Sequence, residues 1–360
     1  MNEHLFFREQ LLAWFARHHR PLPWKGERDP YKIWLSEIIL QQTRVEQGLP
    51  YYHRFTARYP TVHHLANAPE DEVLKLWEGL GYYARARNLH FAAKYISDEL
   101  KGQFPDTLAN IRTLKGVGDY TAAAIASFAF DLPHAVLDGN VYRVLARYFG
   151  IETPIDTPHA KREFAALAQQ LLDPARPGDY NQAIMDFGAT HCTPQQPKCP
   201  SCPLQNHCVA LRTERVSTLP VKSRAPVKKE RFFLYLVAQF QGDTFVRKRT
   251  DKDIWQNLWE FPMLELPALP KNLEEELNSM IPRGGSIRFS RPYRQTLTHR
   301  VVTAIFCEID FPENTPSDTF DRAPFEGCTR IPKTNLKKNI AMPRIIDQYL
   351  RESALSLSLF

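Results

Sequence analysis

The chain has 360 residues, which is enough for two domains with sizeable cores. Its composition, 43% hydrophobic and 24% charged, is that of a soluble globular protein, and no apolar run reaches the roughly 18 residues that a membrane span needs. The net charge of +6 favours a polyanionic partner without identifying one. The N-terminus mixes charged and apolar residues, which predicts an amphipathic helix rather than a signal peptide, so we expect a cytoplasmic protein with reduced thiols.

Residues 1–211 show the 3.6-residue periodicity of helices, interrupted by proline and glycine. No alternating, strand-like run of useful length occurs among them. We therefore predict a mainly α-helical first domain. Its expected helices include Tyr31–Gln47, Pro69–Gly79, Ala84–Leu100, Tyr120–Phe130, Val141–Tyr148 and His159–Leu172.

The pattern changes after Leu211. Residues 212–231 carry seven basic and two acidic side chains with two prolines, which indicates an exposed basic connector. From residue 232 to 360, segments rich in β-branched and aromatic residues alternate with helical ones, which predicts an α+β domain. The expected strands are Phe232–Phe240, Thr244–Lys248 and Val301–Ile309, and the expected helices are Leu273–Met280 and Met342–Ser353.

The segment from Trp34 to Arg44 reads as an apolar helix interrupted by one carboxylate, Glu37. The residues three or four positions away on the same side are Ile33, Trp34, Leu40 and Gln41. Partial desolvation favours the neutral form of a carboxyl group, and a neutral carboxyl can act as a proton donor near neutral pH. The alternative is a solvated glutamate on the outer face of the helix.

Two glycines, Gly116 and Gly118, lie between two helical segments in the stretch Leu114–Thr121. Glycine lets the backbone turn tightly and approach a phosphate closely, and the following helix offers free N–H groups. This pattern fits a grip on the DNA backbone, although an ordinary helix–turn–helix connector would have the same sequence signature. Asp138, twenty residues beyond Gly118, precedes another helical run and by itself reads as a helix N-cap.

Four of the six cysteines fall within seventeen residues, with the spacing C-x6-C-x2-C-x5-C. These residues are Cys192, Cys199, Cys202 and Cys208. Four thiolates can close a site for zinc or for a [4Fe–4S] cluster, and the spacing alone leaves both open, as it does chance clustering. Cys307 and Cys328 stand apart and are expected to be small buried hydrophobic residues.

The cysteine run resembles the cluster loop of the endonuclease III and MutY group of DNA repair glycosylases. The resemblance implies a [4Fe–4S] cluster held by the loop 192–208, with a structural and DNA-positioning role. It also implies that Gly116 and Gly118 form a helix-hairpin-helix, and that Asp138 stabilises positive charge on the sugar with Asn140 as a supporting residue. The implied fold is a mainly α helix-hairpin-helix glycosylase domain followed by an α+β Nudix-like domain.

The run Ser36–Thr43 resembles the corresponding segment of MutY enzymes almost completely. By that resemblance Glu37 protonates adenine and then guides the attacking water, once the base has been flipped out of the duplex. Bifunctional members of the superfamily carry a lysine where this chain has Tyr120. Tyrosine cannot form a Schiff base, so the expected enzyme hydrolyses the glycosidic bond without strong strand-nicking activity.

Further contacts with DNA are implied by the same resemblance. Gln42 and Thr43 would face the opposite base, Tyr82 would act as a wedge, and Trp24 in the Arg20–Trp24 loop would lie near the base pocket. Without the resemblance, these residues would be interpreted as surface amides and a buried aromatic side chain.

The stretch Trp255–Pro262 resembles the Nudix-like domain that MutY enzymes carry, whose implied task is to recognise 8-oxoguanine opposite adenine. The acidic run at 273–277 does not reproduce the catalytic Nudix motif, so pyrophosphatase activity is not expected. Where the family uses a Phe-Ser-His loop, this chain has Leu297, Thr298 and His299. Thr298 keeps a hydroxyl that can hydrogen-bond the lesion, but the aromatic residue is absent. A strand-edge pair without a ligand is the alternative.

The sequence thus predicts a monofunctional adenine DNA glycosylase of the MutY type, which acts on adenine mispaired with 8-oxoguanine or guanine in double-stranded DNA. We expect a monomer in the cytoplasm, associated with the nucleoid. One alternative is an endonuclease III-like glycosylase/lyase for oxidised pyrimidines, which Tyr120 and the C-terminal domain disfavour. Another is a non-catalytic iron–sulfur DNA-binding module.

Overall fold

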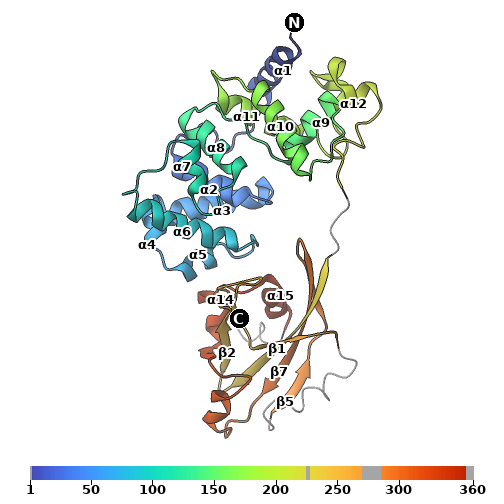
Figure 1. Cartoon of the computed structure of the whole chain (residues 1–360). Helices are drawn as coiled ribbons and strands as arrows, with labels where there is room; N and C mark the ends of the chain where they lie inside the picture. The colour runs from blue at the N-terminus through green and yellow to red at the C-terminus, as the bar shows by residue number, and fades with distance from the viewer. Residues whose placement is uncertain (1, 224–227, 270–284, 354–360) are drawn as a thin grey trace. The chain divides into compact units, whose positions relative to one another are not determined.

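The computed structural model describes residues 2–223, 228–269 and 285–353 (Figure 1). The chain divides into two compact units, and each is described by itself. The first unit contains residues 1–67 and 88–225, and the second contains residues 68–87 and 226–360. No helix in the described ranges is both long enough and apolar enough to cross a membrane.

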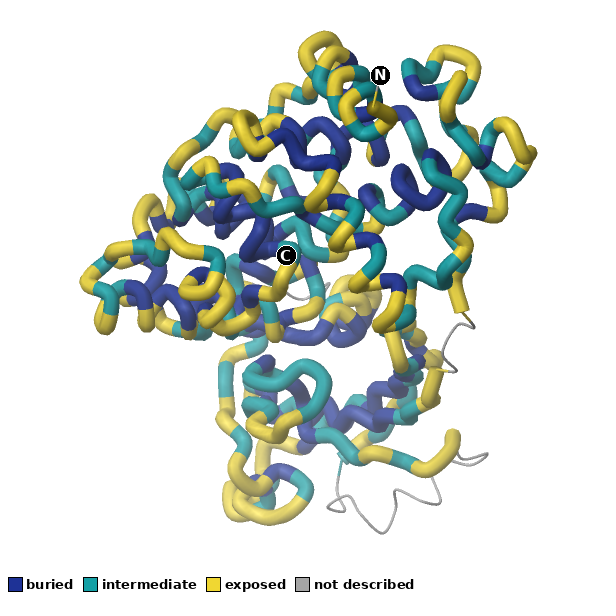
Figure 2. Tube along the Cα trace, turned by 45° about the horizontal axis from the view of Figure 1, so that its top comes forward, coloured by how far each residue is buried: buried dark blue, intermediate teal, exposed yellow. Residues whose placement is uncertain are grey.

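The first unit is helical, as predicted. Buried residues run along the inner sides of its helices (Figure 2). Its helices are α1 Glu3–His18, α2 Pro30–Leu40, α3 Val45–Arg58, α4 Val62–Asn67, α6 Ala84–Asp98 (from Asn88 onward), α7 Leu108–Thr113, α8 Asp119–Phe130, α9 Gly139–Phe149, α10 Pro158–Leu171, α11 Pro177–Thr190 and α12 Val209–Arg212.

Helix α2 starts at Pro30, where the Asp29 side chain accepts the Tyr31 N–H, and every residue from Ile33 to Ile39 is buried. The prediction of one helix from Tyr31 to Gln47 was wrong. The helix ends at Leu40, Gln42 adopts a left-handed conformation with φ of 54°, and a new helix begins at Val45.

Helix α3 accounts for this break because it packs back against α2. Gly48 lies in this contact, where a Cβ atom would come within 2.8 Å of Leu40 Cδ2 and require that side chain to shift. Gln41, predicted on the same helical face as Glu37, instead caps α2, and its amide donates to Thr121 Oγ1 of α8 at 3.1 Å.

The second unit is built around a mixed sheet, and eight strands belong to it within the described residues. Strands β1 and β7 pair in parallel at the centre, from Lys229↔Arg300 to Gln239↔Asp310, and the other pairings are antiparallel. The strands are β1 Lys229–Phe240, β2 Asp243–Lys248, β3 Trp259–Glu260, β4 Met263–Leu266, β5 Ser286–Phe289, β6 Tyr293–Thr296, β7 Arg300–Asp310 and β8 Thr329–Pro332.

Alternate residues of β1 enter two different hydrophobic clusters, one on each face of the sheet. Phe233 and Tyr235 pack with helix α15, Arg344–Glu352, whereas Leu234 and Leu236 pack on the opposite face. The predicted α+β character and three expected strands are confirmed, with β1 starting at Lys229 inside the predicted connector. The expected helix Leu273–Met280 lies outside the described residues, and the expected helix Met342–Ser353 corresponds to α15.

The contacts divide the chain differently from the sequence-based boundaries of 1–211 and 232–360. The division falls between residues 225 and 226, and residues 68–87 group with the second unit. This segment contains α5, Glu70–Leu76, whose polar side chains explain the grouping. Asp71 accepts from Lys248 Nζ and Glu70 accepts from the Asn257 amide, both at 2.6 Å.

Candidate active site

Glu37 is a buried carboxyl group on α2, with 6% of its surface exposed. Burial raises the pKa of Glu37 to about 7; a hydrogen bond with Tyr120 opposes this rise, and the charge of Asp138 adds to it. The carboxyl is therefore substantially protonated at neutral pH. The alternative of a solvated glutamate on the outer face of the helix is wrong.

Tyr120 is the second residue of α8 and places its hydroxyl against Glu37. The same hydroxyl lies 3.4 Å from Met185 Sδ. Burial, together with the charges of Glu37 and Asp138, raises the pKa of Tyr120 well above its ordinary value. The phenol consequently stays neutral and serves as a hydrogen-bond donor.

Asp138 is the N-cap of α9, as a reading of the bare sequence suggested. Its Oδ1 accepts the backbone N–H groups of Asn140 at 2.9 Å and Val141 at 2.8 Å, and its Oδ2 accepts from Asn140 Nδ2 at 2.8 Å. Protein around the carboxyl raises the pKa of Asp138, while these three donors favour the ionised form and oppose the rise. Asn140 is itself held by Arg143, whose Nη2 donates to its side-chain oxygen at 2.7 Å.

One cavity of about 800 Å³ in the first unit brings these groups together. Helices α2, α8, α9 and α11 contribute polar groups to it, and the loops at residues 20–25 and 41–44 supply part of its wall. This volume accommodates a nucleotide-sized ligand. The predicted site residues that line it are Trp24, Glu37, Gln42, Thr43, Tyr120, Asp138 and Asn140.

Sequence reasoning missed a charged group in the wall of the same cavity. The buried Asp186 of α11 accepts from Arg20 Nη2 at 2.6 Å and also pairs with Lys25 Nζ. Burial lowers the pKa of Lys25, and the bond with Asp186 opposes this effect. No local pattern could have revealed this group, because its members are 161 and 166 positions apart in the chain.

The predicted hairpin connects α7 and α8, and its glycines do not line the cavity. Gly116 has φ of 86°, and a Cβ atom there would lie 2.8 Å from Asn88 Cβ. Gly118 is the N-cap of α8 and makes no side-chain capping bond. Asp119, which follows it, is ion-paired with Arg112 at 2.8 Å and Lys161 at 2.6 Å, so its charge is balanced at the hairpin.

The remaining predicted DNA contacts belong to the second unit. Tyr82 is half exposed, adopts a left-handed backbone with φ of 48°, and hydrogen-bonds through its hydroxyl with Thr298 Oγ1. Thr298 and His299 form the exposed tip of the turn between β6 and β7, which the Leu297 N–H to Arg300 carbonyl bond closes at 2.8 Å. Leu297 packs against the hydrophobic cluster on the α15 face of the sheet, which gives this turn an apolar anchor.

The four clustered cysteines line one small cavity of about 30 Å³ together with Arg147 and His191. Burial raises the pKa of Cys202 to about 12, and the other cysteines add to this rise. Arg147 Nη1 lies 3.4 Å from Cys192 Sγ. No three His, Cys, Asp or Glu side chains of the described chain converge as ligands of a single metal ion.

Two family models match the chain. Residues 35–170 match the HhH-GPD superfamily of base excision DNA repair proteins, and residues 234–352 match the NUDIX domain. The first match covers α2 to α10 and thus Glu37, Tyr120 and Asp138. The second match covers most of the mixed sheet and α15.

Curated relatives extend the likeness across both units. The chain is 37% identical to the adenine DNA glycosylase of Buchnera aphidicola subsp. Schizaphis graminum over 257 residues, which span 71% of this chain and 74% of that protein. It is 46% identical to the adenine DNA glycosylase of Rattus norvegicus over 226 residues, which span 59% of this chain and 44% of that protein.

Solved structures of similar fold cover the helical part. A thermostable thymine-DNA glycosylase aligns with a TM-score of 0.55 and 30% identity over 58% of this chain and 97% of its own. A non-covalent complex of endonuclease III with DNA aligns with a TM-score of 0.51 and 23% identity, over 59% of this chain and 99% of that one. The second likeness establishes the fold alone.

Proposed function

This chain belongs to the adenine DNA glycosylase family, and on that premise we propose that it hydrolyses the glycosidic bond of adenine mispaired with 8-oxoguanine or guanine. It is a base-excision DNA glycosylase that acts on adenine. The opposite base, the roles of individual residues and the cofactor are the parts of this function that we propose.

The observation that carries the mechanism is that Glu37 and Asp138 line one cavity but differ in their hydrogen bonds, since one donor, Tyr120, acts on Glu37 and three act on Asp138. Burial raises the pKa of Glu37 to about 7 despite the opposing hydrogen bond from Tyr120, so at neutral pH a large share of Glu37 holds a proton that it can donate. Asp138 receives three N–H donors that favour its ionised form. Two carboxyl groups whose environments differ in this way divide into an acid and a charge stabiliser.

We propose that the Glu37 O–H donates its proton to a ring nitrogen of adenine, and the bond between the base and C1′ of the sugar then breaks. The electron pair of this bond leaves with adenine, and the Asp138 carboxylate stabilises the positive charge that develops on the sugar. Water adds to C1′, and the Glu37 carboxylate accepts the proton that the water loses. Asn140 positions Asp138 through its amide and is itself oriented by Arg143.

The position of Tyr120 supports a hydrolytic, monofunctional enzyme. Its phenol hydrogen-bonds Glu37, at the place where bifunctional relatives carry a lysine. Lys25 also lines the cavity, but its amine is paired with Asp186.

The hydrogen bond between Tyr82 and Thr298 supports a role in reading the opposite base. It joins a predicted wedge and a predicted lesion-reading hydroxyl that are 216 residues apart in the chain. Both side chains are exposed, and hydroxyls donate or accept as the edge of a base requires. We propose that Thr298 and His299 recognise 8-oxoguanine with Tyr82 as a wedge beside them, while Gln42 and Thr43 face the opposite base.

We propose that Cys192, Cys199, Cys202 and Cys208 hold a [4Fe–4S] cluster with a structural role. The donor set fits, because four thiols share one cavity and Arg147 offsets negative charge there. Arg147 of α9 holds the start of the loop 192–208 through bonds to the carbonyls of Thr193 and Pro194, and the four cysteines would supply the ligands of the cluster.

Single-turnover cleavage of four matched duplexes tests this function. They carry adenine opposite 8-oxoguanine, adenine opposite guanine, adenine opposite thymine, and thymine glycol opposite adenine. We expect rapid adenine loss opposite 8-oxoguanine, slower loss opposite guanine, and strand breaks only after alkali. Alkali-independent nicking at thymine glycol would support an endonuclease III-like lyase instead, and binding without any base release would support a non-catalytic module.

A further inference from the structure

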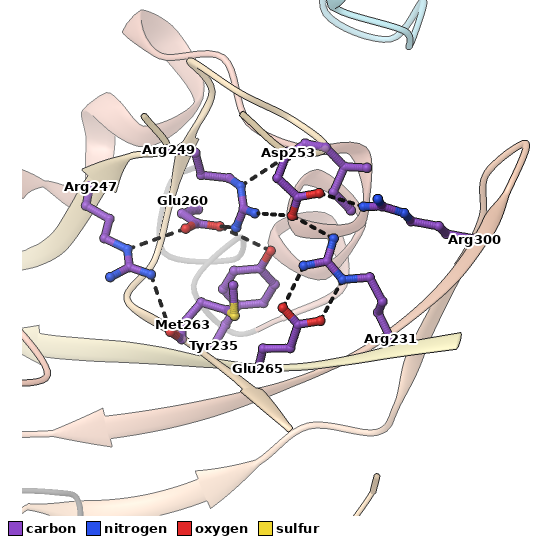
Figure 3. Close-up of polar contacts among 10 residues, drawn as sticks. Arg231, Tyr235, Arg247, Arg249, Asp253, Glu260, Met263, Glu265 and Arg300 are labelled. Atoms are coloured by element: carbon purple, nitrogen blue, oxygen red, sulfur yellow. Dashed lines mark hydrogen bonds and ion pairs between the residues drawn. The ribbon is translucent and has the colours of Figure 1, made fainter. Parts of the chain in front are cut away.

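The second unit contains a network of four arginines and three carboxylates close to the turn that carries Thr298 (Figure 3). Strands β1, β2, β3, β4 and β7 and the loop from residue 249 to 258 contribute to it. Its members are Arg231, Arg247, Arg249, Asp253, Glu260, Glu265 and Arg300, and we call it the arginine–carboxylate network.

Asp253 is the centre of this network because it accepts hydrogen bonds from three arginines. Arg300 Nη1 donates to Oδ1 at 2.5 Å, and Arg231 Nη1 and Arg249 Nη2 donate to Oδ2 at 2.6 and 3.3 Å. Burial alone would raise the pKa of Asp253, but the bonds from Arg231 and Arg300 outweigh it and lower the pKa to about 2. The carboxylate thus stays ionised and binds all three arginines at any physiological pH.

The network is fixed to the core of the unit on the side away from the turn. Arg249 Nη1 donates to Glu260 Oε2 at 2.7 Å, and the two side chains are only 8% and 1% exposed. Arg231 forms a two-bond pair with Glu265 of β4, each bond at 2.6 Å. Asp253 is therefore bonded to two arginines that are themselves paired with other carboxylates, one of them in the buried Arg249–Glu260 pair.

On its other side the network reaches the turn between β6 and β7. Arg300, the first residue of β7, accepts the Leu297 N–H through its carbonyl and so closes the turn. Its side chain is the one that Asp253 binds. Thr298 and His299 are the two residues between Leu297 and Arg300, and the His299 carbonyl accepts the Lys229 N–H at 3.0 Å.

We propose that Asp253 is a positioning residue that fixes the Thr298–His299 turn through Arg300 and thereby sets the preference for the base opposite adenine. This inference rests on the proposed reading of 8-oxoguanine by Thr298. The backbone hydrogen bonds of the turn fix its register. The Asp253–Arg300 pair restrains the end of the turn, where β7 begins, against the rest of the network. A side chain that distinguishes two bases by hydrogen bonding must be held in position. Ordering it before binding reduces the entropic cost of forming those bonds.

The test compares Arg300→Gln with Arg288→Gln in the full chain. Both changes remove one arginine that is paired with carboxylates of the second unit. Arg288 is more exposed, at 62% against 38% for Arg300, and pairs with Glu308 and Asp310 instead of Asp253. Two quantities are measured. One is the ratio of the single-turnover rates on adenine opposite 8-oxoguanine and opposite guanine. The other is hydrogen–deuterium exchange of the peptide 293–303.

We expect Arg300→Gln to lower the rate ratio about tenfold and to speed exchange in the turn, while Arg288→Gln leaves both unchanged. Arg300→Lys, which keeps a donor for Asp253, should recover most of the ratio. Asp253→Asn should have the same two effects as Arg300→Gln. If Asp253→Asn fails to fold, Arg300→Gln still tests the inference, because a change of the Arg300 side chain leaves the backbone bonds of the turn intact.

A ratio that is unchanged in Arg300→Gln would overturn the inference and leave the network with a purely structural role. Unchanged exchange in the turn would overturn it equally. A wild-type enzyme with no preference for 8-oxoguanine would instead overturn the proposed opposite-base specificity. In that case the exchange measurement would still decide whether the network holds the turn.

Discussion

The Tyr120 hydroxyl hydrogen-bonds the Glu37 carboxyl group, so α8 and α2 join the phenol and the proposed acid at one side of the cavity. This bond lowers the pKa of Glu37, whereas burial raises it, and the balance stands at about 7. The proton on Glu37 is thereby held near the working pH of an enzyme, where general acids are most effective.

Glu37→Gln should abolish most adenine excision, because the amide cannot donate the proton that the leaving base needs. We expect a fall of about 10²- to 10⁴-fold in the single-turnover rate, with duplex binding retained. Glu46→Gln is the control, since Glu46 is an exposed carboxylate of the same cavity. An equal loss in both variants would contradict a specific role for Glu37.

The excision rate should fall as the pH rises through about 7, because Glu37 then loses its proton. Tyr120→Phe removes a bond that lowers this pKa, so the falling limb should move to higher pH. The profile of each enzyme is measured by single-turnover cleavage between pH 5 and 9. Tyr142→Phe, on α9 and outside the cavity wall, should leave the limb in place; a limb unmoved by Tyr120→Phe would refute the coupling.

The same burial makes Glu37 costly for stability at neutral pH. Its pKa is about 7 in the folded chain against 4.5 ordinarily, so the folded state binds more protons between these values and loses stability as the pH rises through them. Glu37→Gln should therefore become more stable than the wild type by a margin that grows to about 3 kcal/mol above pH 7. Urea unfolding at pH 5, 6, 7 and 8 measures this margin, and a constant difference would contradict it.

Substitutions of Asp138 should separate its capping role from its chemical one. Asparagine keeps the backbone cap through its side-chain oxygen but turns an NH2 group toward Asn140 Nδ2, so Asp138→Asn should lower the free energy of unfolding by about 1 kcal/mol. It should still reduce excision by about 10²- to 10³-fold, because the charge that stabilises the sugar cation is lost. Asp138→Ala should lose about 1 kcal/mol of stability as well. Full excision activity of Asp138→Asn would show that Asp138 only caps α9 and has no role in the chemistry.

Iron content tests the cysteine site. The purified protein should contain four irons per chain and absorb near ~400 nm, which a closed-shell zinc site would not do. Cys202→Ala should lose the iron and weaken DNA binding, whereas Cys328→Ala, a half-buried cysteine of the second unit, should keep both. Stoichiometric zinc without iron in the wild type would show that the cluster assignment is wrong.

Much of the fold was readable from sequence because its signals are local. The apolar run around Glu37, the two glycines of the hairpin and the alternation in β1 each depend on neighbours a few positions away. The break after Leu40 was missed because its cause is the packing of α3 through Gly48. The grouping of residues 68–87 with the second unit depends in the same way on partners such as Lys248, far along the chain.

The sequence by itself determined which side chains are available, including one acid in an apolar helix, a tyrosine in place of a lysine, and four closely spaced cysteines. Only the tertiary structure decided the state of those groups. It buried Glu37 beside Tyr120 and Asp138, which sets the protonation of the acid. It also brought Arg231 of β1 and Arg300 of β7, which are 22 and 47 positions from Asp253 in the chain, onto that carboxylate beside Arg249. Protonation and ion pairing follow from desolvation and from distances between groups, and these exist only once the chain is folded.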